Sequence, residues 1–113
     1  MNEPLEKRLQ ELRDQASLFA EAEAKRSYLD NYKHSKLAIL MKEFEGPDCK
    51  SVAAQEREAR AHPEFIELLG ALRDATEIAE KNKWFLNIAM RGSSLYQTQQ
   101  ATLRAEMNAY NSK

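Results

Sequence analysis

Three side chains near the middle of the chain are of the types that bind metal ions or act as nucleophiles and acids: Asp48, Cys49 and His62. A zinc site needs three or four converging ligands, and this spacing matches no established ligand pattern. The second histidine, His34, has an alanine rather than a ligand four residues further on, which is typical of a solvated helix residue. We therefore predict no metal site and no cofactor, and interpret Cys49 as a turn thiol.

The sequence lacks the other motifs that build catalytic sites. It has no glycine-rich phosphate loop, no Cys-x-x-Cys and no His-Glu-x-x-His. Its carboxylates are mixed with basic residues, often four positions away, as in Glu3 with Lys7 and Glu21 with Lys25. Such pairs stabilise exposed helices, whereas a catalytic carboxylate needs burial to shift its pKa. We predict a protein that is not an enzyme and has no catalytic residues, with an enzyme built on the three mid-chain residues as the remote alternative.

The charge distribution gives a second chemical lead. Residues 1–80 carry a net charge of −5 and residues 81–113 a net charge of +4. Basic groups attract phosphate, and exposed aromatic rings stack on unpaired bases, so single-stranded nucleic acid is a possible ligand. The candidate contacts are Lys81, Lys83, Arg91 and Arg104. In the competing interpretation the nearby rings, Phe85, Tyr96 and Tyr110, belong to a core or an interface, because they fall on apolar helical rows.

Composition limits the class of protein. The chain has 113 residues, of which 42% are apolar and 31% charged, with three glycines, three prolines and one cysteine. This length suits a single domain, and one cysteine forms no internal disulfide. No apolar run reaches the roughly 18 residues that cross a bilayer, and the N-terminus has no secretory pattern. We predict a soluble, cytoplasmic protein that does not contact the membrane.

Glycine and proline divide the chain into three helical segments. The breaks fall at Gly46-Pro47 and at His62-Pro63. They predict helices over about 4–45, 50–61 and 64–110 within one helical domain spanning 1–113. Asn2 is the expected cap of the first helix, Gly46 its C-terminal stop, and Asp48 or Ser51 the cap of the second.

The third segment carries an apolar row with alternating spacings of three and four residues. Eleven of its fourteen positions are apolar. The row comprises Phe65, Leu68, Leu72, Ala75, Ala79, Asn82, Leu86, Ala89, Ser93, Tyr96, Gln100, Leu103, Met107 and Tyr110. This spacing is required of a left-handed coiled-coil seam. Asn82 either fixes the register of that seam or is merely tolerated there, and Gly92-Ser93-Ser94 is a place for a bend or for close approach of another backbone.

The first segment has a similar stripe at both ends but not in the middle. Arg26, Asp30 and Lys33 occupy positions where the seven-residue repeat requires apolar side chains. We interpret this as a change of face, caused by a second packing partner or a stutter. The two long helices, joined by a short one, predict an all-α, antiparallel, coiled-coil-like helical hairpin.

A second apolar stripe on the third segment needs a cover that the short helix supplies only in part. It consists of Leu69, Ile78, Trp84, Phe85, Ile88 and Leu95. Exposed apolar surface of this extent usually marks an interface. We therefore predict a homo-oligomer, a dimer or higher, with a helical-bundle cross-section.

Several stretches resemble a family of short helical proteins encoded in tailed-bacteriophage and prophage genomes. They are Tyr28-Leu29-Asp30-Asn31-Tyr32, Leu37-Ala38-Ile39-Leu40-Met41, Ser51-Val52-Ala53-Ala54-Gln55-Glu56, Ala59-Arg60-Ala61-His62-Pro63-Glu64-Phe65 and Gln99-Gln100-Ala101-Thr102-Leu103-Arg104-Ala105-Glu106. The likeness covers roughly residues 20–107. Family members often have a tryptophan just before the last stretch, whereas the tryptophan of this chain is Trp84.

The resemblance implies a protein of the bacterial host cytoplasm, often encoded beside phage recombination and replication genes, but it transfers no functional residue. Together with the apolar stripes it leads to one hypothesis, a non-enzymatic helical protein that self-associates and binds a protein partner. The alternative hypothesis is an accessory protein of recombination or replication that binds single-stranded DNA.

Overall fold

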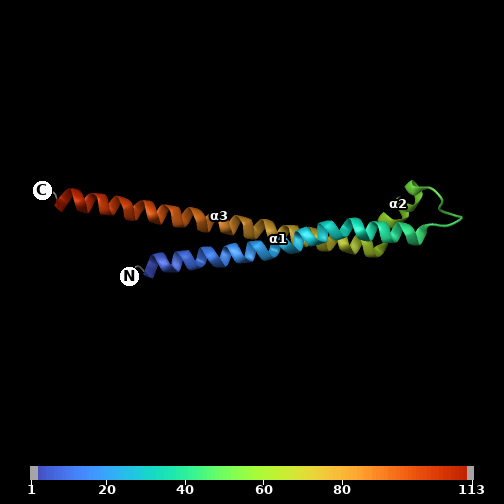
Figure 1. Cartoon of the computed structure of the whole chain (residues 1–113), viewed down its shortest axis with the longest axis horizontal. Helices are drawn as coiled ribbons and strands as arrows, with labels where there is room; N and C mark the ends of the chain where they lie inside the picture. The colour runs from blue at the N-terminus through green and yellow to red at the C-terminus, as the bar shows by residue number, and fades with distance from the viewer. Residues whose placement is uncertain (1–2, 112–113) are drawn as a thin grey trace. The chain divides into compact units, whose positions relative to one another are not determined.

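The computed structural model describes residues 3–111, and three helices account for nearly all of them. They are α1 (Glu3–Phe44), α2 (Val52–Arg60) and α3 (Pro63–Asn111), shown in Figure 1. The described residues contain no β-strand, only an isolated bridge between Gly46 and Cys49. The all-α helical hairpin with a short connecting helix is thus confirmed, and each helix begins and ends within two residues of its predicted bounds. Asn2, the expected first cap, lies outside the described residues.

Contacts divide the chain into two compact units. The elbow unit is Glu21–Glu80, and the terminal unit consists of the residues up to Ala20 together with those from Lys81 onward. Both long helices continue from one unit into the other, and within each unit α1 and α3 run antiparallel (Figure 1). The single domain over 1–113 stays a prediction.

The core of the elbow unit is small and involves all three helices. Leu40 of α1, Ala59 of α2 and Phe65 of α3 are buried together, and Leu37, Met41 and Phe44 pack against them. Leu40 and Phe65 are the largest side chains that are fully buried. The short helix therefore packs on the hairpin end through Ala59, while Leu69 and Ile78 of the second apolar stripe stay exposed.

The turn after α1 differs from the expected glycine stop. No glycine among the described residues has a positive φ, so Gly46 does not adopt the left-handed conformation typical of a helix C-terminus. Instead the Cys49 N–H donates a hydrogen bond of 3.1 Å to the Gly46 carbonyl. Gly46 thus opens a four-residue turn with Pro47 at its second position, where the fixed φ of proline fits.

Side chains cap the two later helices. The Ser51 hydroxyl accepts a hydrogen bond of 3.1 Å from the Ala54 N–H, so Ser51 rather than Asp48 caps α2. At the start of α3, Nδ1 of His62 accepts a hydrogen bond of 3.1 Å from the Glu64 N–H. Pro63 occupies the first helical position, where its missing N–H does no harm.

The predicted seam of α3 faces α1 over most of its length. Phe65, Ala75, Ala79 and Ser93 are buried, and the other seam residues up to Gln100 are partly buried. The last three, Leu103, Met107 and Tyr110, were expected in the seam but are exposed. The reason is that Leu5, close to the described start of α1, already lies at the level of Tyr96 and Gln100, which line one hollow with it.

The change of face in the middle of α1 stays a prediction, because Ala22 and Leu29 of the neighbouring row are also partly buried. Arg26, Asp30 and Lys33 are partly buried and continue the same row of α1 that faces α3. Lys36 of α1 contacts Glu64 of α3, which sets the register of the two antiparallel helices. Arg26 lies ten residues before Lys36, so it lies beside the part of α3 about ten residues after Glu64, near Ala75. The alanine at this level of α3 leaves room for the stem of Arg26, whose guanidinium pairs with Glu23 on its own helix.

Candidate interaction surface

One face of α3 in the terminal unit carries large apolar side chains without a cover. Trp84, Ile88 and Leu95 expose 60%, 63% and 64% of their surface. With two basic residues they form an unbroken row at spacings of three and four residues, which we call the outer row. The outer row consists of Lys81, Trp84, Ile88, Arg91 and Leu95. Such spacing keeps all five on one side of a helix, so they form a single surface.

The helix geometry explains why this row stays uncovered. Successive residues of an α-helix are about 100° apart around its axis. Leu86 and Ser93, whose row faces α1, therefore lie roughly half a turn from Trp84 and Leu95. Phe85, which is also exposed, lies on the flank between the two rows. The hairpin thus buries one row of α3 and leaves Trp84, Ile88 and Leu95 of the opposite row exposed.

The structure divides the predicted interface residues between the two units. Trp84, Phe85, Ile88 and Leu95 belong to the terminal unit, whereas Leu69 and Ile78 belong to the elbow unit. Sequence reasoning did not single out several other exposed apolar residues. They are Leu18, Tyr28, Ile39, Val52, Ile66 and Met90. Tyr28 stacks on Tyr32 with ring centroids 6.0 Å apart, and single exposed apolar side chains such as Val52 are ordinary on protein surfaces.

The four candidate nucleic-acid contacts do not share one face. Lys81 and Arg91 lie on the outer row with Trp84. Lys83 is only two residues from Lys81, which places it roughly 200° away around the helix. The Arg104 Nε donates to the Gln100 carbonyl at 3.4 Å, and the same side chain lines the hollow beside Leu5. Two basic residues, not four, therefore accompany the exposed tryptophan.

An arginine of α1 contacts the seam side of α3 in the terminal unit. The Arg8 guanidinium lies 4.7 Å from the centre of the Tyr96 ring and donates to the Gly92 carbonyl at 3.5 Å. The α-helix continues without a break through Gly92 and Ser93. The expected close approach at this position is therefore made by a side chain rather than by another backbone.

Beyond Gln100 the seam of α3 continues past Glu3, the first described residue of α1, as Figure 1 shows. Leu103, Met107 and Tyr110 are exposed there, and Tyr110 most of all, at 80%. We call these three residues the overhang. They are a second uncovered apolar surface of the terminal unit, separate from the outer row on the same helix.

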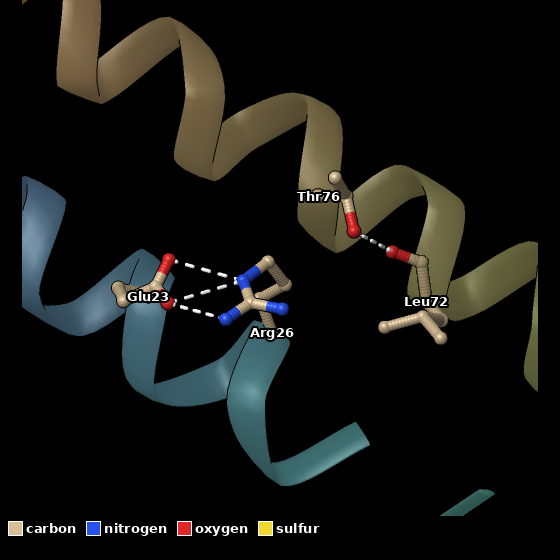
Figure 2. A network of polar contacts seen from close by, with 4 residues as sticks. All are labelled: Glu23, Arg26, Leu72 and Thr76. Atoms are coloured by element: carbon tan, nitrogen blue, oxygen red, sulfur yellow. Dashed lines mark hydrogen bonds and ion pairs between the residues drawn. The ribbon is translucent and has the colours of Figure 1, made fainter. Parts of the chain in front are cut away.

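The elbow unit has charged pairs of two kinds: one that links α1 to α3 and others that lie within a single helix. The Lys36 ammonium donates to Glu64 at 2.7 Å across the hairpin. This hydrogen bond, and then the opposite charge, raise the pKa of Lys36 and lower the pKa of Glu64. On α1, the Arg26 Nε donates to both carboxylate oxygens of Glu23, as Figure 2 shows, and these hydrogen bonds raise the pKa of Arg26. The Lys36–Glu64 pair therefore links α1 to α3, whereas the Arg26–Glu23 pair stabilises α1 alone.

Figure 2 also shows Thr76, a polar residue of α3, near the Glu23–Arg26 pair of α1. The Thr76 hydroxyl donates to the Leu72 carbonyl of the preceding turn at 2.8 Å. The hydroxyl is thereby satisfied within its own helix. Because its hydroxyl bonds to its own helix, Thr76 needs no polar partner on α1, although it is partly buried.

The mid-chain residues Asp48, Cys49 and His62 have structural surroundings. Within residues 3–111, no three histidine, cysteine or acidic side chains lie close enough together to hold a metal ion. His62 uses Nδ1 to accept the Glu64 N–H, and its ring lies edge-on to Phe44 with centroids 6.1 Å apart. The backbone of Cys49 closes the turn from Gly46. Sequence reasoning missed the capping role of His62, although its position directly before Pro63 at a helix start was a signal for it.

Comparisons with protein families, curated proteins and solved structures find no match to this chain. Within residues 3–111, no helix is both long enough and apolar enough to pass through a membrane.

Proposed function

We propose that this protein is a non-enzymatic helical protein of the phage type, which self-associates and binds a protein partner through the terminal unit. The observation that carries the proposal is the outer row. Its three apolar side chains are more than half exposed on one face of a helix whose opposite face is already packed. Apolar rows of this kind are the anchors by which one helix docks on another.

The resemblance to phage and prophage proteins supports the class but not the partner. It rests on stretches from α1, α2 and α3, among them the segment Ala59–Phe65 at the end of α2. Members of that family often lie beside recombination and replication genes, so a protein of one of those processes is the partner to test first.

Light scattering on the purified protein at micromolar concentration tests self-association. We expect a mass of at least twice 13.0 kDa. A pull-down from expressing cells, repeated after nuclease treatment, tests the protein partner. We expect one protein to be retained with and without nuclease. A monomer by light scattering together with an empty pull-down would contradict the proposal.

Binding of single-stranded DNA is the second candidate, and one observation favours it. Lys81 and Arg91 lie on the same helix face as the exposed Trp84 ring, so phosphate attraction and base stacking are available on one surface. This candidate predicts salt-sensitive binding of a single-stranded oligonucleotide that weakens in K81E/R91E.

The matched control is K83E, which makes the same type of charge change on another side of the helix. Equal weakening by K83E and by R91E indicates attraction by net charge without a defined site. No retardation of the oligonucleotide at low salt removes this candidate.

A further inference from the structure

We infer that the outer row is the contact surface of an isologous dimer, in which α3 of a second copy packs antiparallel with a two-fold axis near Ile88. The inference deepens the proposed function and rests on its self-association. It names the partner as a second copy of this chain, the contact face as the outer row, and the orientation of the two helices as antiparallel.

The spacing of the outer row is nearly symmetric about Ile88. Trp84 lies four residues before Ile88, and Arg91 lies three residues after it. Further out, Lys81 and Leu95 each lie seven residues away. A two-fold axis at Ile88 therefore brings Arg91 of each copy to Trp84 of the other, Lys81 to Leu95, and the two isoleucines together.

Charge determines the orientation. In a parallel pair, Lys81 would face Lys81 and Arg91 would face Arg91, and like charges packed together at an interface are costly. In the antiparallel pair each cation meets an apolar or aromatic side chain instead. Tryptophan is the ring that attracts a cation best, and arginine is the cation most often found over such rings, while the lysine stem covers leucine and its ammonium reaches water.

The terminal unit already contains the contact that this dimer would form twice. Arg8 lies over the ring of Tyr96 at 4.7 Å, across two antiparallel helices. Arg91, by contrast, makes no hydrogen bond or ion pair within residues 3–111. Its charge and the exposed Trp84 ring are thus both available for an intermolecular contact of the same kind.

Single cysteines placed on the outer row test the orientation. In a Cys49→Ser background, Ile88→Cys and Leu95→Cys are made separately and treated with a short thiol-specific cross-linker. Near the axis, the two Ile88→Cys thiols should be joined in good yield. The two Leu95→Cys positions are 14 residues apart along the antiparallel pair, about 21 Å, and should not be joined. Mixing Lys81→Cys with Leu95→Cys chains should restore cross-linking.

Light scattering without cross-linker accompanies the test, so that the two inferences can fail separately. A monomer contradicts the dimer and the self-association on which it rests, whereas the pull-down tests the other protein partner separately. A dimer in which Leu95→Cys cross-links to itself is parallel and overturns this inference alone. A dimer that cross-links at neither position uses another surface and also overturns it.

R91E should raise the dimer dissociation constant at least tenfold, while K83E leaves it unchanged; the reverse result would contradict the pairing.

Discussion

His62 caps the N-terminus of α3, a role usually filled by serine, threonine, asparagine or aspartate. Its Nδ1 accepts the Glu64 N–H at 3.1 Å, while the ring contacts Phe44. We expect His62→Ala to lower the free energy of unfolding by about 1 kcal/mol or more, since both the cap and the ring contact are lost. His62→Asn restores an acceptor and should lose less. Urea unfolding measures both variants.

His34 provides the control, because it is an exposed histidine inside α1. His34→Ala should change the free energy of unfolding by less than about 0.5 kcal/mol. Equal losses from His62→Asn and His62→Ala would mean that the ring contact, and not the cap, stabilises the start of α3.

The ion pair between Lys36 and Glu64 predicts a pH dependence with a definite sign. Lys36 lowers the pKa of Glu64 below its ordinary 4.5, so the folded state binds this proton less readily than the unfolded state does. The stability from the pair is therefore fully present above pH 4.5 and is lost as the pH falls through the lowered pKa. Urea unfolding of wild type and Glu64→Gln should differ at pH 7 and converge at low pH.

Lys36 gives the opposite sign at the other end of the pH scale. Glu64 raises the pKa of Lys36 above 10.5, so its contribution is present below that pH and is lost as the pH rises through the raised value. The stability difference between wild type and Glu64→Gln should accordingly show a plateau over the neutral range. A difference that persists unchanged at pH 3 would contradict the ion pair as its cause.

At the scale of an element, α3 carries two glycines in its interior without a conformational need for them. Neither has a positive φ, and a Cβ at Gly70 would meet nothing within 4 Å. A Cβ at Gly92 would lie 3.6 Å from an Arg8 nitrogen, an ordinary contact. We expect Gly70→Ala and Gly92→Ala each to stabilise the helix by about 0.5 to 1 kcal/mol, measured by thermal and urea unfolding. Destabilisation by Gly92→Ala would indicate that the Arg8 contact has no room to adjust.

The burial along the seam predicts that chemically identical substitutions differ greatly in cost. Leu40 is fully buried beside Ala59 and Phe65, whereas Leu103 on the overhang is 52% exposed. Leu40→Ala should cost about 2 to 5 kcal/mol of unfolding free energy, and Leu103→Ala less than about 0.5. Urea unfolding below the dimer dissociation constant gives the comparison. A large loss from Leu103→Ala at that concentration would mean that the overhang is packed within one chain.

The sequence predicts which side of α3 faces α1, because the spacing of apolar residues determines the buried face of a helix. The same spacing does not show which residues of α1 lie opposite each position, so Leu103, Met107 and Tyr110 look like seam residues but are exposed. Charged residues suggest a change of face, yet Arg26 and Lys33 are partly buried, because the stem of a long side chain can pack while its charged end pairs with a neighbouring carboxylate.

The candidate surface was predictable only in part for a related reason. Periodicity identifies Trp84, Ile88 and Leu95 as a second stripe, since they repeat at helical spacing. It does not separate Leu69 and Ile78 from them, because the division of one continuous helix between two units depends on contacts with other segments. Nor do counts of basic residues show that Lys81 and Lys83 lie on different sides of the helix.

For the whole molecule, the proposed association links stability to protein concentration. A partner that binds only the folded chain stabilises it by about 2.7 kcal/mol when its concentration is 100 times the dissociation constant. The melting temperature should therefore rise by several degrees over a hundredfold increase in concentration. Calorimetry or circular dichroism at the two concentrations measures the shift.

Two variants determine which surface produces this concentration effect. Ile88→Glu places a charge at the proposed two-fold axis and should abolish the dependence, whereas Leu103→Glu alters the overhang and should retain it. Both residues are exposed, so neither change disturbs the fold of one chain. If Leu103→Glu abolishes the dependence and Ile88→Glu does not, the copies associate through the overhang, and the outer row is then left for the other protein partner.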